Sequence, residues 1–312
     1  MIIHQAAFAE KGPFLKGNLH GHTTRSDGQN TPEEVLRFLR ERGYDFAALT
    51  DHRIYNFKNF APETGITVIP GMEYDNMLEQ GNGFRCFDTV CIGPEKENGN
   101  GYEQDQTFPS GTAPNQEEYQ AQLDQIHAKG NLTFYCHPEW SSTPARYFEK
   151  QKGNFAMEIW NTCSVRINDS EMNAAYWDEV LGQGVRIFGV AVDDGHSLAD
   201  YAGGWVMVRA ENTVPAILDA LKEGRFYSSC GPVITDFYIE DDNAVVECEP
   251  AAKICLHADR HPGRVVASDD GALTRAVFPL STWAGNYDDY VRATVLDAKG
   301  NRAWTNPIWL KP

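Results

Sequence analysis

The chain repeats one pattern, in which a short apolar run is followed at once by an acid or a histidine. Residues 46–49 lead to His52, and residues 185–192 lead to Asp194. Apolar runs of this length, separated by stretches of helical periodicity, are typical of buried parallel strands. Because the carboxyl ends of such strands share one face of a β/α fold, the polar residues that follow them are expected to converge. The pattern predicts an α/β fold with its functional site at the strand ends.

The first candidate donors lie near the N-terminus. His20 and His22 are one residue apart in an extended segment, so their side chains point to the same side. Asp27 follows in a Ser-Asp-Gly turn that can bring its carboxylate back over the strand end. A histidine pair that stands alone is more often structural than metal-binding, but here similar donors follow later apolar runs. The candidate metal ligands are therefore His20, His22, Asp27, His52, Glu73, His137, Asp194 and His196.

This donor set predicts a cluster of metal ions. Eight nitrogen and oxygen donors exceed the number that one tetrahedral zinc site uses. Burying so many acids and imidazoles together would be costly without cations. We therefore expect two or three divalent ions, with Glu73 as a bridging carboxylate. Mixed imidazole and carboxylate ligation suits Mn, Fe or Zn, and the sequence does not choose among them.

The remaining elements divide the chain into two predicted domains. Helical signals and periodicity occur around residues 31–43, 119–130, 174–184 and 213–221, and further strands are expected at 66–74, 87–92, 132–138, 155–163 and 205–208. Residues 76–116 are expected to hold an insertion or active-site loop. After residue 230 only short strand-like runs remain, with a hairpin signal at 297–300. We predict a metal-binding barrel over residues 1–230 and a small antiparallel β-sandwich over residues 231–312.

Composition limits the classes of partner. The chain of 312 residues has 27 Lys and Arg against 44 Asp and Glu, for a net charge of −17. A surface this acidic repels nucleic-acid backbones and anionic membranes, so non-specific nucleic-acid binding is not expected. There is no signal-peptide pattern and no apolar run near 18 residues, and the seven scattered cysteines do not suggest a disulfide framework. The expectation is a cytoplasmic protein without a membrane partner.

The motifs, taken in order, resemble those of the PHP (polymerase and histidinol phosphatase) superfamily. They are His-x-His-x-x-x-x-Asp-Gly from His20, Thr-Asp-His at 50–52, Pro-Gly-Met-Glu at 70–73, Cys-His-Pro at 136–138 and Asp-Gly-His at 194–196. The resemblance covers residues 16–230 and implies a distorted seven-stranded β/α barrel that holds two or three metal ions. The eight donors match the family's ligands one by one. The tail, at 224–229 and 303–308, resembles a two-domain branch grouped with carbaryl-hydrolase-like metallohydrolases.

The resemblance also implies a ninth ligand between His137 and Asp194. Cys163 is the first choice for it, and Asn161 is the alternative. Because the family varies at this position, the occupancy of a third metal site is left open.

The first functional hypothesis is a phosphoesterase that acts on a small phosphomonoester or nucleotide through a metal-bridging hydroxide. Arg25 and Arg53 lie beside the predicted ligands and can pair with phosphate oxygens, although ordinary surface arginines are the alternative. Asn161 is a further candidate substrate-binding residue. Asp193 is a candidate catalytic acid for the leaving group, with a solvent-facing histidine as the alternative source of the proton. For Asp193 itself, a role as partner of a metal ligand and a position as a solvated loop residue are both open.

The second hypothesis keeps the metal ions and changes the bond, to a carbamate, amide or ester. A cavity with aromatic walls and no substrate-binding cation would favour this chemistry. Trp140, Trp160 and Tyr55 are the candidate walls, although aromatic residues near strand ends more often belong to the core. A third hypothesis, a metal-binding scaffold without catalysis, is weaker because every donor of the motifs is present.

Overall fold

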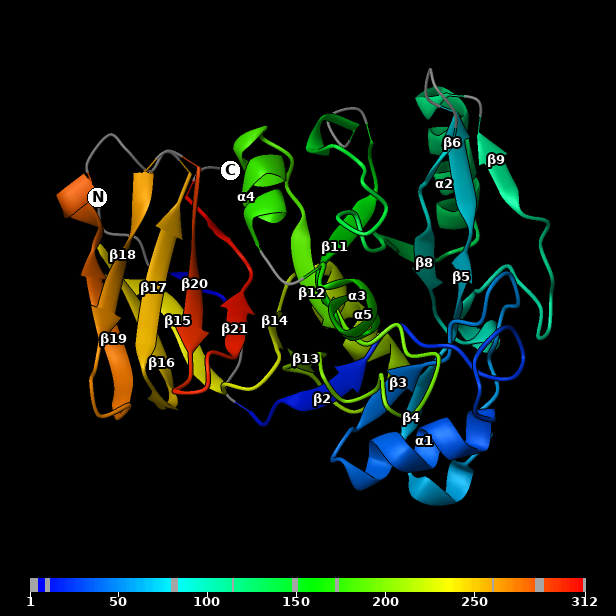
Figure 1. Cartoon of the computed structure of the whole chain (residues 1–312), viewed down its shortest axis with the longest axis horizontal. Helices are drawn as coiled ribbons and strands as arrows, with labels where there is room; N and C mark the ends of the chain where they lie inside the picture. Colours follow the sequence, from blue (N-terminus) through cyan, green and yellow to red (C-terminus); the bar gives the residue numbers. More distant parts are fainter. Residues whose placement is uncertain are drawn as a thin grey trace.

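The protein is described by a computed structural model that covers residues 5–8, 12–79, 84–113, 115–147, 151–171, 174–259, 261–283 and 289–310. It is a mixed α/β fold joined at one end to an antiparallel β region, shown in orange and red in Figure 1. The helices are α1 (Pro32–Glu41), α2 (Gln116–Ala128), α3 (Thr162–Asn168), α4 (Ala175–Gly182) and α5 (Val214–Lys222). Short 3-10 helices occupy Pro62–Thr64, Lys96–Asn98, Ala145–Tyr147 and Leu280–Trp283.

A five-stranded sheet forms one part of the α/β region. Its order is β12 (Phe188–Val192), β11 (Asn154–Asn161), β10 (Leu132–Tyr135), β8 (Thr89–Ile92) and β5 (Gly71–Tyr74). β10, β11 and β12 are parallel, whereas β8 is antiparallel to both of its neighbours. A small sheet of β7 (Phe84–Cys86), β6 (Asn76–Glu79) and β9 (Gly111–Ala113) lies beyond β5 in the segment expected to be a loop.

A ten-stranded sheet runs through both halves of the molecule. Its order is β18 (His261–Ala267), β17 (Lys253–Ala258), β20 (Tyr290–Leu296), β21 (Arg302–Thr305), β14 (Phe226–Ser229), β13 (Trp205–Val208), β2 (Leu15–Asn18), β3 (Phe46–Ala48) and β4 (Thr67–Ile69), and β22 (Ile308–Trp309) pairs with β20. The pairing of β14 with β21 joins the C-terminal strands to the α/β region. The boundary expected after residue 230 therefore lies within continuous β structure, and the division into two domains stays a prediction.

A distorted seven-stranded β/α barrel was expected, but no closed barrel is found in the described part of the chain. The predicted barrel strands are divided between the two large sheets, and β8 and β13 run antiparallel to neighbours there. Pro70 lies between β4 and β5, which pair in different sheets. Because proline has no backbone N–H, it cannot donate to a strand ladder at this point. The α/β class is confirmed, while the strand count and the closure of the barrel are not.

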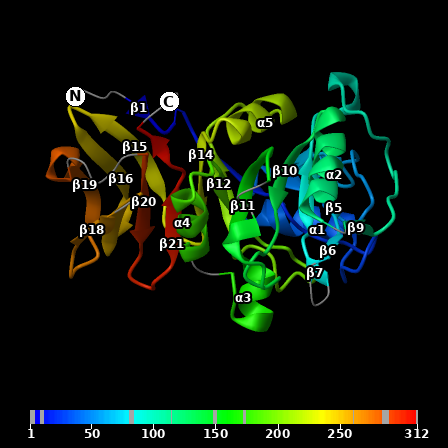
Figure 2. The same cartoon turned by 90° about the horizontal axis from the view of Figure 1, so that it is seen from above.

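The C-terminal region packs a second sheet on the end of the ten-stranded one. This sheet contains β1 (Gln5–Ala6), β15 (Ile234–Glu240), β16 (Asn243–Ala251) and β19 (Leu273–Pro279), all antiparallel. Figure 2 shows β1 beside β15, so the N-terminal strand completes the C-terminal region. Phe237 and Ile239 alternate with less buried residues and enter a buried cluster with Ile254 and Val295 from the facing sheet. The predicted antiparallel C-terminal region is present.

Local sequence signals explain the first helix. Thr31 accepts a hydrogen bond from the Glu34 N–H, and the Glu34 carboxylate accepts one from the Thr31 N–H. Pro32 occupies the first turn, where its missing N–H costs nothing. Leu36 and Leu39 supply part of the buried side. None of the described helices is long and apolar enough to span a membrane.

Candidate metal centre

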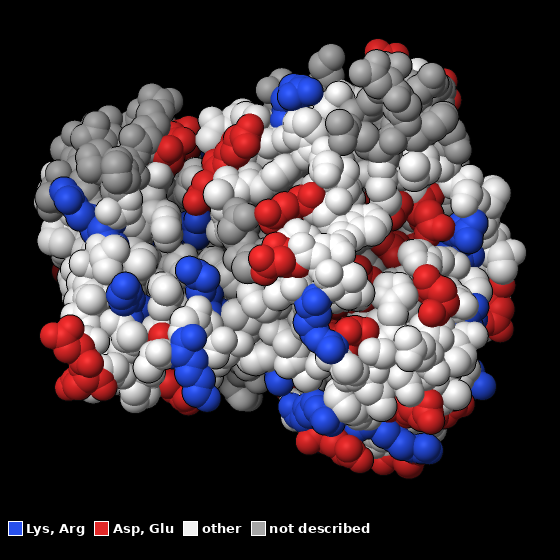
Figure 3. All heavy atoms as spheres, in the orientation of Figure 1, with Lys and Arg blue, Asp and Glu red and all other residues white. Residues whose placement is uncertain are grey.

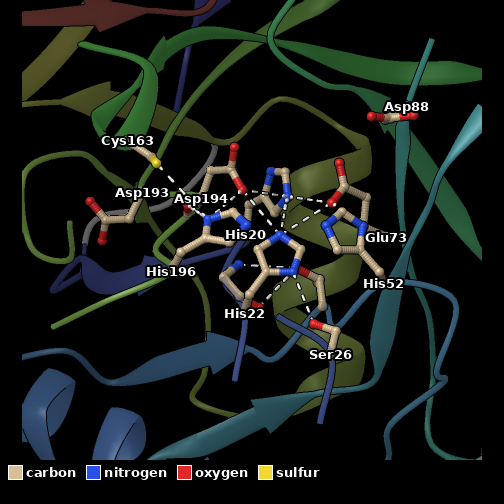
Figure 4. A network of polar contacts seen from close by, with 12 residues as sticks. His20, His22, Ser26, His52, Glu73, Asp88, Cys163, Asp193, Asp194 and His196 are labelled. Atoms are coloured by element: carbon tan, nitrogen blue, oxygen red, sulfur yellow. Dashed lines mark hydrogen bonds and ion pairs between the residues drawn. The ribbon is translucent and has the colours of Figure 1, made fainter. Parts of the chain in front are cut away.

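Four of the predicted donors meet in the interior. His20 Nε2 lies 3.2 Å from Glu73 Oε2 and 3.2 Å from Asp194 Oδ1, and His22 Nε2 lies 3.2 Å and 3.0 Å from the same two oxygens. The two imidazole nitrogens are 3.2 Å apart (Figure 4). All four residues are at most 7% exposed. Two imidazoles and two carboxylates aimed at one point are a suitable donor set for a divalent cation.

Main-chain hydrogen bonds bring these donors together. The Asp194 N–H donates to the His20 carbonyl over 3.0 Å, and the His22 N–H donates to the Gly195 carbonyl over 2.9 Å. These two hydrogen bonds join the segment after β2 to the loop after β12. Residues that are far apart in the sequence face one another because their strands end at the same place.

A second donor group shares His22 with the first. Asp27 Oδ2 lies 3.5 Å from His52 Nε2 and 3.5 Å from His196 Nε2, and Asp27 Oδ1 lies 3.7 Å from His22 Nδ1. A short parallel bridge between His52 and Glu73 connects this group to the first. The Asp27 side chain is 56% exposed, so this group faces the open side of the site. Its side chains are a second group that could hold a metal ion.

A third group surrounds the other oxygen of Glu73. Glu73 Oε1 is buried without a hydrogen bond, and His137 Nε2 is 3.5 Å away. Asp88 Oδ2 lies 3.9 Å from His137 Nε2 and accepts a hydrogen bond from the Cys86 thiol. Cys163, the predicted ninth ligand, is placed instead with its Sγ 3.9 Å from His196 Nδ1. Its coordination of a metal stays a prediction, whereas Asp88 joins the candidate ligands.

The charged side chains of the site strongly shift one another's pKa values. Burial alone would lower the pKa of His20, but Asp194 and neighbouring carboxylates hold it well above its ordinary value. Burial likewise opposes protonation of His52 and His196, yet hydrogen bonding to Asp27 helps to raise both pKa values to about 11. Acids and imidazolium groups thus compensate one another where cations would otherwise bind.

Glu158 on β11 holds several donors in place. Its Oε1 lies 2.6 Å from His20 Nδ1, which leaves Nε2 of that ring for the interior. Its Oε2 accepts hydrogen bonds from the His137 N–H and from the Asn161 side-chain amide. The same amide donates to Asp194 Oδ2 over 3.0 Å. Asn161 is fully buried, so its position favours support of Asp194 over the predicted contact with substrate.

Two further acids fix the open side of the site. His52 Nδ1 lies 2.6 Å from Asp75 Oδ1, which turns His52 Nε2 towards Asp27. Asp51 accepts hydrogen bonds from Thr23 and from Ser26, and so fixes the turn that carries Asp27. Carboxylates that orient metal-binding imidazoles are a regular part of such sites.

The sequence held signals for some of these missed residues. Glu158 is a charged residue within the apolar run 155–160, and a buried charge needs a partner. Asp75 follows β5 directly, so the expectation that polar residues after strand ends converge applies to it as well. Asp88 was missed because it precedes its strand, and only the antiparallel direction of β8 places its start beside the ends of its neighbours.

Asp193, the predicted catalytic acid, is fully buried away from the donor groups (Figure 4). Its carboxylate accepts hydrogen bonds from the N–H groups of Ala202, Gly203 and Gly204 and from the Thr162 hydroxyl. Burial raises its pKa to about 6, against the lowering effect of these bonds. With its oxygens occupied, Asp193 is suited to anchoring the loop after β12 rather than to protonating a leaving group.

The two predicted substrate-binding arginines are engaged elsewhere. Arg25 forms an ion pair with Asp105. Arg53 Nε lies 3.0 Å from Asp75, and its Nη1 donates to Ser110 Oγ over 2.7 Å. Neither arginine lines the cavity over the donor groups. Their contact with a phosphate is not supported by this geometry.

A cavity of about 560 Å³ opens over the three donor groups. Figure 3 shows acidic side chains recessed in a hollow on this face of the molecule. Of the three candidate aromatic walls, Trp140 lines the cavity, Tyr55 is fully buried and Trp160 packs near Trp304. The lining residues are Asp27, His52, Glu73, Asp88, His137, Trp140, Cys163, Ser164, Ile167, Asn168, Asp194 and His196.

Three residues that are donors or lie next to one have left-handed backbone conformations. The φ angles are 57° at Arg53, 29° at His137 and 51° at Asp194. Non-glycine residues in this region carry strain, which is often concentrated at functional sites. Here these conformations redirect the chain at or just after the strand ends that carry the donors.

Comparison with solved structures gives distant similarities. A two-domain protein from Bacteroides vulgatus ATCC 8482 that contains a predicted PHP-like metal-dependent phosphoesterase is 15% identical, with a TM-score of 0.47 and 95% of each chain covered. A candidate metal-dependent phosphoesterase from Bifidobacterium adolescentis ATCC 15703 is 12% identical, with a TM-score of 0.38, over 59% of this chain and 89% of the other. An amidohydrolase from Chromobacterium violaceum, with bound sulfate and no metal, is 15% identical, with a TM-score of 0.40, over 58% and 87%.

Sequence comparison assigns the family. No curated protein matches the chain. The PHP domain matches residues 18–227, which contain all three donor groups. The chain therefore belongs to the PHP domain family.

Proposed function

We propose that the protein hydrolyses a small phosphoester with two or three bound divalent cations. The observation that carries the proposal is the position of Glu73 between two donor groups. Its Oε2 lies 3.2 Å from both His20 and His22, and its orphaned Oε1 faces His137. A buried carboxylate with one oxygen that makes no hydrogen bond, and with imidazoles on both sides, fits a bridging ligand of a multinuclear centre.

Divalent cations in this centre would lower the pKa of a water molecule, to supply the nucleophile, and would stabilise charge at the phosphoryl group. The chain supplies the positioning. Glu158 and Asp75 orient His20 and His52 through their Nδ1 atoms. The buried donors close the floor of the cavity, and the exposed carboxylate of Asp27 marks the side from which substrate and solvent enter.

The test is a panel of phosphomonoesters and nucleotides with protein that has been stripped of metal and reloaded with Mn, Fe or Zn. We expect phosphate release that chelation abolishes and metal restores. Asp194→Asn is expected to abolish it, and Asp269→Asn, at an exposed turn of the C-terminal region, serves as the matched control. Loaded protein that releases phosphate from no member of the panel would contradict the proposal.

One observation favours a second function, the hydrolysis of a carbamate, amide or ester. Among the described residues, the cavity lining includes Trp140 and Ile167 but no lysine or arginine. Metal-dependent hydrolysis applies to a carbonyl as well as to a phosphoryl group. Turnover of carbamates or esters without any phosphoester turnover, and without competitive inhibition by inorganic phosphate, would favour this second function.

A further inference from the structure

Two large apolar side chains are exposed at the rim of the metal centre. Trp140 is 46% exposed and Ile167 is 68% exposed, and both line the same cavity as the donor groups. Exposed apolar residues that are grouped beside a polar cavity mark a binding surface more often than scattered ones do. We propose that Trp140 and Ile167 form a subsite for an aromatic or compact apolar group of the substrate.

The Trp140 ring is held beside the reaction centre. It makes an edge-to-face contact with the His137 ring, at a centroid distance of 4.9 Å and an angle of 73°. The main-chain N–H of Trp140 donates to Glu171 Oε1 over 2.6 Å, and the main-chain N–H of Glu171 donates to Glu139 Oε2 over 2.8 Å. This reciprocal pair fixes the loop after β10, so the indole is positioned before a ligand arrives. A preorganised aromatic wall loses little entropy when a ring packs on it.

Ile167 is carried by α3. This helix is capped by Asn161, whose Oδ1 accepts the Ser164 N–H while its amide donates to Asp194. The main-chain N–H of Asn161 also donates to the Glu171 carbonyl over 3.2 Å. Glu171 therefore connects the loop that carries Trp140 to the start of the helix that carries Ile167. Asn161 in turn connects this helix to Asp194, a candidate metal ligand.

The charge of the cavity lining and the volume of the cavity indicate which group the subsite binds. Close to the donor groups the cavity is acidic and would be neutralised by cations, whereas towards Trp140 and Ile167 the described lining carries no basic side chain. An anionic tail on the substrate would find no counter-charge there, but an uncharged ring gains contact area. The cavity volume of about 560 Å³ suits a small ester with one ring system.

This subsite rests on the proposed function, and two pairs of metal-binding probes separate the two claims. Methylphosphonate and phenylphosphonate test a phosphoryl site, and acetohydroxamate and benzohydroxamate test a carbonyl site. Their affinities are measured by calorimetry on metal-loaded protein, with the metal content of each variant determined in parallel. We expect the phenyl member to bind roughly tenfold tighter or more than the methyl member of at least one pair.

The variants identify the residues. Trp140→Ala and Ile167→Ala are each expected to reduce the phenyl preference, with unchanged metal content and unchanged affinity for the methyl probes. Trp140→Phe is expected to retain most of the preference, because it keeps a ring at the wall. Val265→Ala is the matched control, since it removes an exposed apolar side chain from β18 in the C-terminal region.

Each outcome has a defined meaning. Equal affinity for the methyl and phenyl members of every pair that binds, or a phenyl preference that survives Trp140→Ala together with Ile167→Ala, would overturn the subsite. A phenyl preference confined to hydroxamates would support the subsite and contradict the phosphoester proposal. If no probe binds to metal-loaded protein, both claims fail.

Discussion

At the scale of single residues, the centre depends on acids that hold imidazoles. Each oriented ring points one nitrogen into the site because the other nitrogen is occupied: Glu158 holds His20, and Asp75 holds His52. Both acids decide the direction in which the other nitrogen of the ring points, so metal affinity should depend on them.

The first prediction concerns Glu158. Glu158→Gln is expected to lower metal affinity by about 10- to 100-fold, because an amide is a weaker partner for His20 Nδ1 and cannot accept at both ends. Metal titration with a competing chelator measures it. Glu240→Gln, an exposed acid on β15, controls for the loss of one negative charge. An unchanged affinity in Glu158→Gln would show that His20 needs no carboxylate to orient it.

The second prediction concerns pH. The pKa values of His52 and His196 are raised to about 11 and that of His137 to about 10 in the metal-free site. Their rings are therefore protonated at neutral pH, and a proton must leave before a cation can bind. Metal affinity is expected to rise with pH over about pH 6 to 9. Calorimetry in buffers of different ionisation enthalpy should detect the released protons, and the absence of proton release would contradict this account.

At the scale of elements, local signals decide where helices begin. Thr31 and Glu34 form reciprocal hydrogen bonds at the start of α1, as the sequence predicts. Thr213 precedes α5 in the same way, but its side chain makes no capping hydrogen bond. The two helices therefore allow the contribution of one cap to be measured within one protein.

The third prediction compares these caps. Thr31→Ala is expected to lower the free energy of unfolding by about 1 kcal/mol, because a main-chain N–H at the helix start loses its partner. Thr213→Ala is expected to have a much smaller effect. Denaturant unfolding of both variants provides the measurement. Equal losses would indicate that the two threonines act through something other than the capping bond.

At the scale of the whole molecule, an ion pair joins the C-terminal strands to the α/β region. Arg292 on β20 is 1% exposed, and its Nε and Nη2 donate to Asp178 on α4 over 2.8 Å and 2.6 Å. The guanidinium carbon lies 4.8 Å from the Trp177 ring centroid. Because of this contact and the continuous ten-stranded sheet, we expect the C-terminal strands and the α/β region to unfold together.

The fourth prediction tests that connection. Asp178→Ala leaves the Arg292 charge buried without its partner and is expected to cost roughly 2–3 kcal/mol, since Asp178 itself is partly exposed. Glu63→Ala breaks the Arg37–Glu63 pair, which is exposed on both sides and screened by solvent, and is expected to change the stability far less than Asp178→Ala does. Thermal unfolding that remains a single transition in both variants would support one cooperative unit, whereas two separate transitions in the unaltered protein would contradict it.

The sequence by itself determined the local part of this protein. Much of the order of strands and helices, the cap at Thr31 and the alternation that places His20 and His22 on one side follow from neighbouring residues, whereas β6, β7, β9, β18 and α3 were not predicted. The expectation that polar residues after strand ends converge selected donors that the structure brings together. These features could be predicted because they depend on backbone geometry and side-chain periodicity within a few residues.

Only the tertiary structure decided which distant groups meet. The antiparallel direction of β8 brings Asp88 to the site. Arg25 pairs with Asp105 and Arg53 pairs with Asp75, so neither predicted arginine faces the cavity. Trp140 is exposed at the rim, while Tyr55 is buried. The physical reason is that strand direction, ion-pair choice and burial are set by competition among contacts far apart in the chain, which no local pattern records.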